Sequence, residues 1–146
     1  MCSSDLHVQL LRVESLYLRA RCALAMAASH RNPRRFLFIA RAEARRIAKE
    51  RMPWSDPIAL LLRGGIAYLE GSTPRALRYL HAAADQFNRA DMHLYAAVAR
   101  RRIGALEDNA LGRELQRQAE EWMAVQDIKN PAAMTRMLAP GFPDIL

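Results

Sequence analysis

Cysteine, aromatic residues and long apolar runs are all scarce in this chain of 146 residues. Two cysteines, Cys2 and Cys22, cannot build the disulfide framework of a small secreted domain, so a reduced, cytoplasmic setting is expected. Charged residues interrupt every apolar run, and no basic stretch precedes an apolar one at the N-terminus. These absences argue against a membrane-spanning segment and against a signal peptide.

Residues that favour β-strands are also in the minority. Apolar residues make up 51% of the chain, but they are mainly Ala and Leu, and aromatic residues reach only 7%. Ala and Leu favour helices, whereas β-branched and aromatic residues favour strands. A chain of this length usually forms one domain with a core of its own. We therefore expect a single, all-α domain over residues 1–146.

The stretch from Ile58 to Phe87 shows the helical pattern most clearly. It contains two segments with apolar residues three and four apart, joined by Glu70-Gly71-Ser72-Thr73-Pro74. Gly71 is placed to end the first helix, and Thr73 to cap the second with proline in its first turn. So short a connection folds the two helices back on each other as an antiparallel hairpin.

The same alternation of helix and short break continues along the chain. Cap-and-proline pairs are predicted at Asn32-Pro33, Asp56-Pro57 and Asn130-Pro131, and Asp91 is expected to cap one further helix. The expected elements are helical hairpins over about residues 5–51, 57–89 and 91–127, followed by a short terminal helix over about residues 131–138.

One part of the central hairpin is similar to a known repeat. Gly65-Ile66-Ala67-Tyr68, then Gly71, then Ala76, Leu80 and Ala83, resembles the tetratricopeptide repeat pattern. In that family small residues let the two helices of a repeat approach closely. Gly64-Gly65 needs such a packing reason, because a glycine inside a helix costs about 1 kcal/mol relative to alanine. The resemblance implies an all-α fold of three stacked antiparallel hairpins, a tetratricopeptide-like α-solenoid, plus the short terminal helix.

The C-terminal half carries a second resemblance. The segments 91–102, 119–123, 126–131 and 134–142 are similar to the C-terminal helical-repeat region of large bacterial proteins. In those proteins a serine/threonine kinase domain is followed by a nucleotide-binding ATPase module and then by the helical repeats. The resemblance covers about residues 58–142. It implies a bacterial, intracellular signalling protein of which this chain would be the last part.

No catalytic or metal-binding motif occurs in the sequence. The glycine-rich phosphate loop, the His-Arg-Asp and Asp-Phe-Gly motifs of kinases and the Gly-Lys-Ser/Thr loop of ATPases are all missing. No metal-ligand spacing relates the four histidines, which are His7, His30, His81 and His93. We therefore expect no enzymatic activity, no metal and no cofactor in this chain.

The first hypothesis for function is a protein-interaction or regulatory module. In stacked hairpins the first helices of the pairs line a shallow concave surface, where a partner would bind. The candidate contact residues on that surface are Arg63, Tyr68, Tyr95 and Arg102. The expected partner is another domain of a kinase/ATPase protein or a separate acidic protein.

Positive charge gathers in the first third of the chain. The net charge is +7, and residues 1–51 hold eleven basic and four acidic residues, whereas residues 52–146 hold eleven of each. A basic face on the second helix is formed by Arg34, Arg41, Arg45 and Lys49. Three interpretations stay open: a solvated face, a surface for an acidic protein, and, as the alternative function, a nucleic-acid-binding module.

The first helix raises the question of self-association. In a longer solenoid its outer face would pack on a preceding repeat, and terminal repeats need a polar outer face. Exposed Leu16, Tyr17 and Leu24 on that outer face would favour association of two chains.

Overall fold

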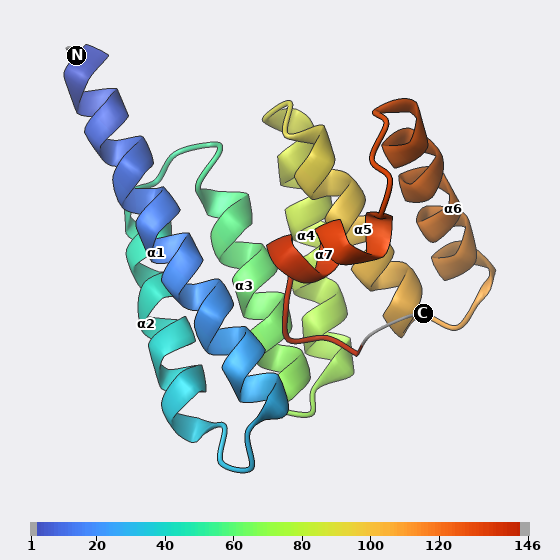
Figure 1. Ribbon diagram of the computed structural model, residues 1–146, viewed down its shortest axis with the longest axis horizontal. Coiled ribbons are helices and arrows are strands. Elements are labelled where there is room, and N and C mark those ends of the chain that lie inside the picture. The colour runs from blue at the N-terminus through green and yellow to red at the C-terminus, as the bar shows by residue number, and fades with distance from the viewer. Residues whose placement is uncertain (1–2, 144–146) are drawn as a thin grey trace.

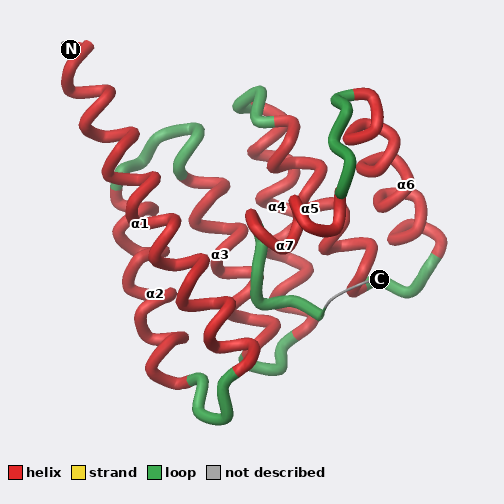
Figure 2. The backbone as a smooth tube through the Cα atoms, viewed as in Figure 1, coloured by secondary structure: helices red, strands yellow, loops and turns green. Residues whose placement is uncertain are grey.

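The chain is all-helical in the part that the structure describes, residues 3–143, where no strand occurs (Figures 1 and 2). In this computed structural model the helices are α1 (Ser3–Ser29), α2 (Arg34–Lys49), α3 (Asp56–Leu69), α4 (Thr73–Arg89), α5 (His93–Leu106), α6 (Ala110–Val125) and α7 (Pro131–Leu138). The all-α prediction is confirmed, and each helix lies where the periodicity placed it.

Neighbouring helices pack side by side in chain order. Helices α1 and α2, α3 and α4, and α5 and α6 form the three closest pairs, and α2 also contacts α3 as α4 contacts α5. Figure 1 shows these six helices as a row of upright elements, with α7 lying crosswise in front of α4 and α5 in the middle of the row. We call α1, α3 and α5 the first helices, and residues 131–143, which comprise α7 and the segment after it, the tail.

Small residues bring the helices close together. Each helix from α1 to α6 contributes a fully buried alanine: Ala20, Ala40, Ala59, Ala83, Ala96 and Ala119. Between them lie the large core side chains, among them Phe87, Leu61, Leu62, Leu80, Ile103 and Met123. Alanine therefore permits the close approach of the helices, and the larger side chains fill the space between them.

Gly64 and Gly65, the two adjacent glycines of α3, each allow a different close packing contact. A Cβ on Gly64 would lie 3.2 Å from the side chain of Leu80, so Gly64 permits the close approach of α3 and α4. A Cβ on Gly65 would lie 3.2 Å from the Leu24 side chain and 3.2 Å from the carbonyl oxygen of Pro140. Gly65 thus makes room for α1 and for the tail.

The helix caps agree with the prediction only in part. Asn130 accepts a hydrogen bond from the backbone N–H of Ala133 at 2.9 Å, as expected of an N-cap. Asp56 and Thr73 do not cap, because each is the first residue of its helix and neither side chain bonds to the backbone there. At α2 the N-cap position is Pro33, and the side chain of Asn32 reaches only the N–H of Arg34, at 3.4 Å.

Asp91 ends α4 and does not cap α5, so its predicted role was wrong. Its φ is 56°, in the left-handed region. The N–H of Met92 donates to the carbonyl of Phe87 at 2.9 Å, and that of Asp91 donates to Asn88 at 3.2 Å. This is the Schellman pattern, which Gly71 also makes, with a φ of 82°, after α3. The connections α3–α4 and α4–α5 therefore have the same geometry.

This geometry makes Asp91 a position where glycine is better suited. We expect Asp91→Gly to raise the free energy of unfolding by about 0.5–1 kcal/mol, because glycine adopts positive φ without a steric cost. The matched control is Asp85→Gly on the exposed side of α4, which should lower it by roughly 0.3–0.5 kcal/mol. Urea denaturation measures both; a loss of stability in both variants would contradict the assignment of Asp91.

The outer face of α1 is not formed by the residues predicted for it. Tyr17 and Leu24 are 3% and 1% exposed, because they face the core, and Leu16 is half-buried beside them. The large apolar residues that α1 does expose include Leu11 and Leu18.

Among residues 3–143, no helix combines the length and apolar character that crossing a membrane requires.

Candidate interaction surfaces

The tail lies across the first helices, on the surface where a partner was expected. Two α1 side chains bind the C-terminal end of α7: the hydroxyl of Tyr17 donates to the carbonyl of Leu138, and the Arg21 guanidinium donates to that of Met137 at 3.1 Å. The last carbonyls of a helix receive no hydrogen bond from an N–H group of the same helix, and they carry partial negative charge. The Tyr17 hydroxyl and the Arg21 guanidinium therefore donate hydrogen bonds to carbonyls that lack a donor within α7.

Arg102 of α5 makes the largest set of contacts with the tail. Its side chain is almost fully buried, and its Nε and Nη2 both donate to the carbonyl of Ala139, at 2.9 and 2.6 Å. Its Nη1 donates to the carbonyl of Pro143 at 3.2 Å. The guanidinium also lies 5.1 Å from the ring centre of Phe142. One side chain thus binds the extended segment at both ends.

Phe142 is the apolar anchor of the extended segment. It is 7% exposed, and its ring centre lies 5.4 Å from that of Tyr68 on α3. Gly141, with a φ of 96°, packs close to Leu24 and Leu69. Proline, a left-handed glycine and a buried ring therefore shape residues 140–142 to follow the surface of α1 and α3.

A second arginine attaches α7 to α5 and α6. Arg101 is 8% exposed, and its guanidinium donates to the hydroxyl of Thr135 at 3.1 Å and to the carboxylate of Glu120 at 3.0 Å. Thr135 in turn donates to the carbonyl of Pro131 at 2.7 Å. The neighbouring buried arginines 101 and 102 thus contact different parts of the tail.

Two tyrosines under the tail are held in the neutral form. Burial raises the pKa of Tyr17 above its usual range, and the neighbouring Tyr95 adds to the effect. Burial also raises the pKa of Tyr95, whose ring centre lies 6.2 Å from that of Tyr17. A neutral Tyr17 keeps the hydroxyl proton that it donates to the carbonyl of Leu138.

The four predicted contact residues are divided between two surfaces. Tyr68 and Arg102 contact the tail directly, and Tyr95 lies behind them against Tyr17. Arg63 lies elsewhere, on the side of α3 that faces α2 and α4. The tail thus covers part of the expected surface, and Arg63 belongs to a different one.

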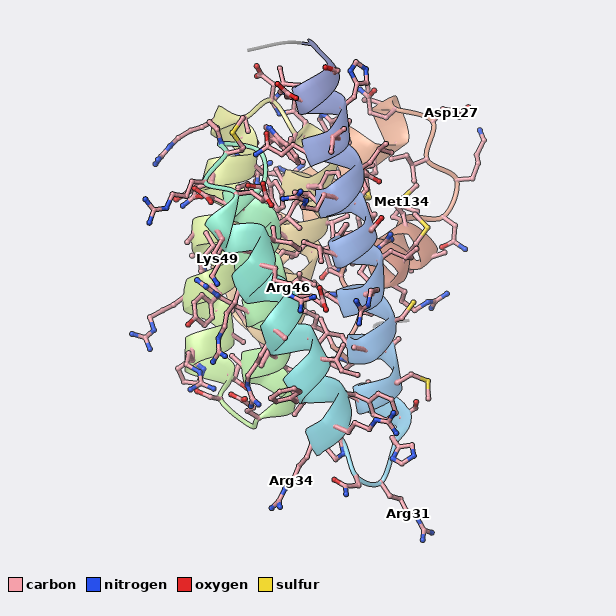
Figure 3. The ribbon with its side chains drawn as sticks, turned by 90° about the vertical axis from the view of Figure 1, so that its left-hand side faces the viewer. Arg31, Arg34, Arg46, Lys49, Asp127 and Met134 are labelled. Atoms are coloured by element: carbon pink, nitrogen blue, oxygen red, sulfur yellow. The ribbon has the colours of Figure 1, made fainter. Side chains whose placement is uncertain are left out.

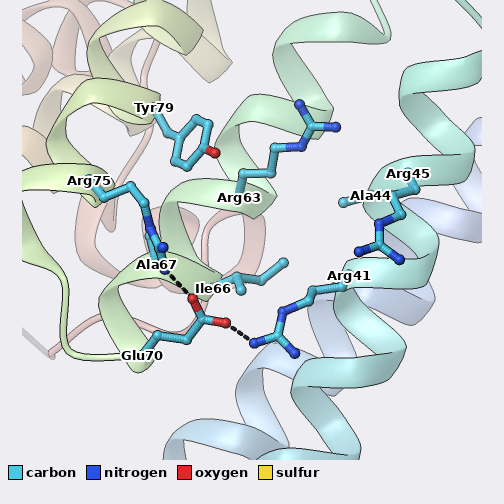
Figure 4. A pocket seen from close by; sticks show the side chains of 9 residues that line it. All are labelled: Arg41, Ala44, Arg45, Arg63, Ile66, Ala67, Glu70, Arg75 and Tyr79. Carbon is cyan, nitrogen blue, oxygen red and sulfur yellow. Dashed lines mark hydrogen bonds and ion pairs between the residues drawn. The ribbon is translucent and has the colours of Figure 1, made fainter.

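That second surface is a cavity of about 230 Å³ between α2, α3 and α4, which we call the arginine pocket (Figure 4). Its charged members are four arginines, one from α3, one from α4 and two from α2, together with one glutamate. The lining residues are Arg41, Ala44, Arg45, Arg63, Ile66, Ala67, Glu70, Arg75 and Tyr79. Glu70 forms ion pairs with both Arg41 and Arg75.

The basic face of α2 leads into the arginine pocket. Arg41 and Arg45 line the pocket, whereas Arg34 and Lys49 are exposed at the two ends of the helix (Figure 3). Glu43 does not interrupt the charge of this face: it is 2% exposed, with its carboxylate toward α1, 3.6 Å from Arg19. The exposed part of α2 is therefore more uniformly basic than the sequence indicates.

No arrangement typical of a metal centre occurs in residues 3–143, where no three His, Cys, Asp or Glu side chains are grouped so that they could bind an ion. The histidines pair separately: His81 with Glu107 at 3.1 Å, and His93 with Asp91 at 3.6 Å. The Glu107 carboxylate is largely buried in the first contact, whereas both side chains of the second are exposed.

Sequence patterns gave no indication of several residues at these surfaces. Tyr17 is expected on the exposed outer face of the first helix, and no sequence motif includes Arg21, Arg75 or Tyr79. The useful signal was Pro140-Gly141-Phe142: an aromatic residue directly after a helix-ending proline and glycine needs a place to be buried. The sequence does not show which surface buries it.

Comparison of the chain with protein-family models, with curated proteins and with solved structures found no match.

Proposed function

We propose that this chain is a non-catalytic, tetratricopeptide-like helical module that binds a segment of another protein on the first helices α1, α3 and α5. The observation that carries the proposal is the tail, which lies on these helices as a bound segment would. Three side chains from two of the helices donate to four main-chain carbonyls of residues 137–143.

The contacts also define the kind of segment that fits. The carbonyls at the end of a short helix meet Tyr17 and Arg21, and the following extended residues place an aromatic side chain against Tyr68. Because most of the hydrogen bonds are to the main chain, binding depends more on the backbone conformation of the segment than on its sequence. The buried phenylalanine provides the main side-chain selectivity.

The covalently attached tail makes the module regulatory. A segment on the same chain competes at an effective concentration of about a millimolar or more, so a partner must bind the first helices more tightly than the tail does. Resemblance to the C-terminal region of kinase/ATPase proteins suggests that this partner belongs to a signalling protein. The binding surface on α1, α3 and α5 becomes accessible only when such a partner displaces the tail.

The test is to replace the tail with a separate peptide. A protease site is introduced at Lys129, whose side chain is 83% exposed in the loop before α7. After folding, the chain is cut, and a fluorescein-labelled peptide of residues 131–143 is added and followed by fluorescence anisotropy. We expect saturable binding to the cut chain and much weaker binding to the uncut chain, where the tail occupies the first helices.

Two variants show whether binding uses the proposed contacts. Arg102→Met should weaken binding of the peptide at least tenfold, about 1.4 kcal/mol, because it removes the donors to residues 139 and 143. Arg100→Met removes the same charge from a half-buried neighbour that makes no ion pair among the described residues, and it should leave the affinity unchanged. Equal effects of the two variants, or no binding to the cut chain, would disprove the proposal.

A further inference from the structure

We infer that the arginine pocket is a binding site for a phosphate group in its doubly charged form. This inference is independent of the proposed function, because the pocket lies between α2, α3 and α4, whereas the tail lies on α1, α3 and α5.

The charge of the pocket is the first part of the evidence. Four guanidinium groups and one carboxylate line a cavity of about 230 Å³, which leaves an excess of three positive charges. Like charges gathered in one cavity repel each other, and a multiply charged anion between them removes the repulsion. A group with two negative charges matches this excess better than a single carboxylate does.

The second part of the evidence is that two arginines of the pocket, Arg45 and Arg63, are unpaired among the described residues. Glu70 neutralises one charge of Arg41 and Arg75 at one end of the pocket. Arg45 and Arg63, on facing helices, make no hydrogen bond or ion pair with any described residue. Figure 4 shows Arg45 extending from α2 and Arg63 from α3, and no dashed line joins either side chain to another residue of the pocket.

Glu70 indicates how an anion would be bound. Two guanidinium groups from different helices already meet on its carboxylate, one on each oxygen. A phosphate group offers three acceptor oxygens, and guanidinium groups bind phosphate with paired, parallel hydrogen bonds. The hydroxyl of Tyr79, which is directed toward Arg63, is a further possible donor to a bound anion (Figure 4). The cavity volume of about 230 Å³ far exceeds the roughly 30 Å³ of a water molecule, so a phosphate group has room.

The test measures binding by isothermal titration calorimetry on the full chain at constant ionic strength. The three probes are inorganic phosphate, the peptide acetyl-Gly-phosphoserine-Gly-amide, and the same peptide with glutamate at the centre. We expect the phosphate probes to bind at least tenfold more tightly than the glutamate peptide. Affinity for the phosphoserine peptide should fall as the pH drops below its second pKa, about 6, since the arginines stay charged throughout.

Two matched double variants show whether the site is the pocket. Arg45→Gln with Arg63→Gln should weaken phosphate binding at least tenfold. Arg34→Gln with Arg35→Gln removes the same charge from exposed positions of α2 outside the pocket and should change the affinity by less than about twofold. A third variant, Glu70→Gln, should strengthen binding, because it frees Arg41 and Arg75 and removes a repelling charge.

The outcomes separate the sources of the phosphate. Tighter binding of the phosphoserine peptide than of inorganic phosphate indicates a phosphorylated protein, and the reverse indicates a small phosphate compound; both support the site. Equal binding of the glutamate peptide, equal losses in the two double variants, or no binding of any probe would overturn it. A loss spread equally over both double variants, together with tight binding of a DNA oligonucleotide, would assign the basic face to nucleic acid instead. None of these results depends on the tail.

Discussion

Arg102→Met is expected to lower the free energy of unfolding by about 2–4 kcal/mol and to release the tail from the first helices. The Arg102 guanidinium is buried and donates to the carbonyls of Ala139 and Pro143. Methionine keeps the apolar part of the side chain but none of its donors. A buried carbonyl without a donor costs roughly 1–3 kcal/mol, so the segment after α7 should detach.

Urea denaturation gives the stability, and hydrogen exchange followed by mass spectrometry shows whether residues 131–143 become exposed. Arg100→Met serves as the control, because Arg100 is half-buried on the same helix and should tolerate the change within about 0.5 kcal/mol. If Arg102→Met leaves both the stability and the exchange of the tail unchanged, Arg102 does not bind the tail.

Gly112→Ala is expected to destabilise the chain by about 2–4 kcal/mol, although alanine is the better helix former. A Cβ on Gly112 would lie 2.0 Å from the carbonyl oxygen of Glu107, a backbone atom that cannot move aside alone. The loop after α5 approaches the first turn of α6 at this point, where Asn109 accepts from the N–H of Gly112 at 2.8 Å. The clash therefore outweighs the gain of about 1 kcal/mol in helix propensity.

Gly71→Ala is the control for this prediction. A Cβ on Gly71 would meet no atom within 4 Å, so only its positive φ of 82° opposes alanine there, at a cost of roughly 1–2 kcal/mol. Thermal or urea unfolding of both variants gives the comparison. A Gly112→Ala chain as stable as the original would show that the carbonyl of Glu107 does not lie against Gly112.

The helices followed from local signals in the sequence. Apolar residues three and four apart define a buried face wherever the chain is helical, and proline restricts where a helix can start. The exact ends were less certain, as Asp91 illustrates. Aspartate is favoured both as an N-cap and at positive φ, so the residue type alone cannot decide whether it begins one helix or ends the previous one.

The binding surfaces could be predicted only in part, because they depend on contacts between distant parts of the chain. Repeat geometry predicts Arg63 and Arg102 on one shared surface, but the sequence does not show which neighbouring segment each side chain faces. Arg102 meets carbonyls 37 and 41 residues farther along the chain, which no local pattern indicates. Likewise the arginine pocket needs Arg45, Arg63 and Arg75 from three different helices.

The most direct test of the first helices as a binding surface is an NMR titration of the chain cut at Lys129. The body is labelled with ¹⁵N, its own tail is removed, and the unlabelled peptide of residues 131–143 is added. We predict that amide signals of α1, α3 and α5 around Tyr17, Gly65 and Arg102 shift and saturate, while those around Arg45 in α2 stay unchanged. Absence of shifts on the first helices, or shifts confined to α2 and α4, would contradict the binding of a protein segment at this surface.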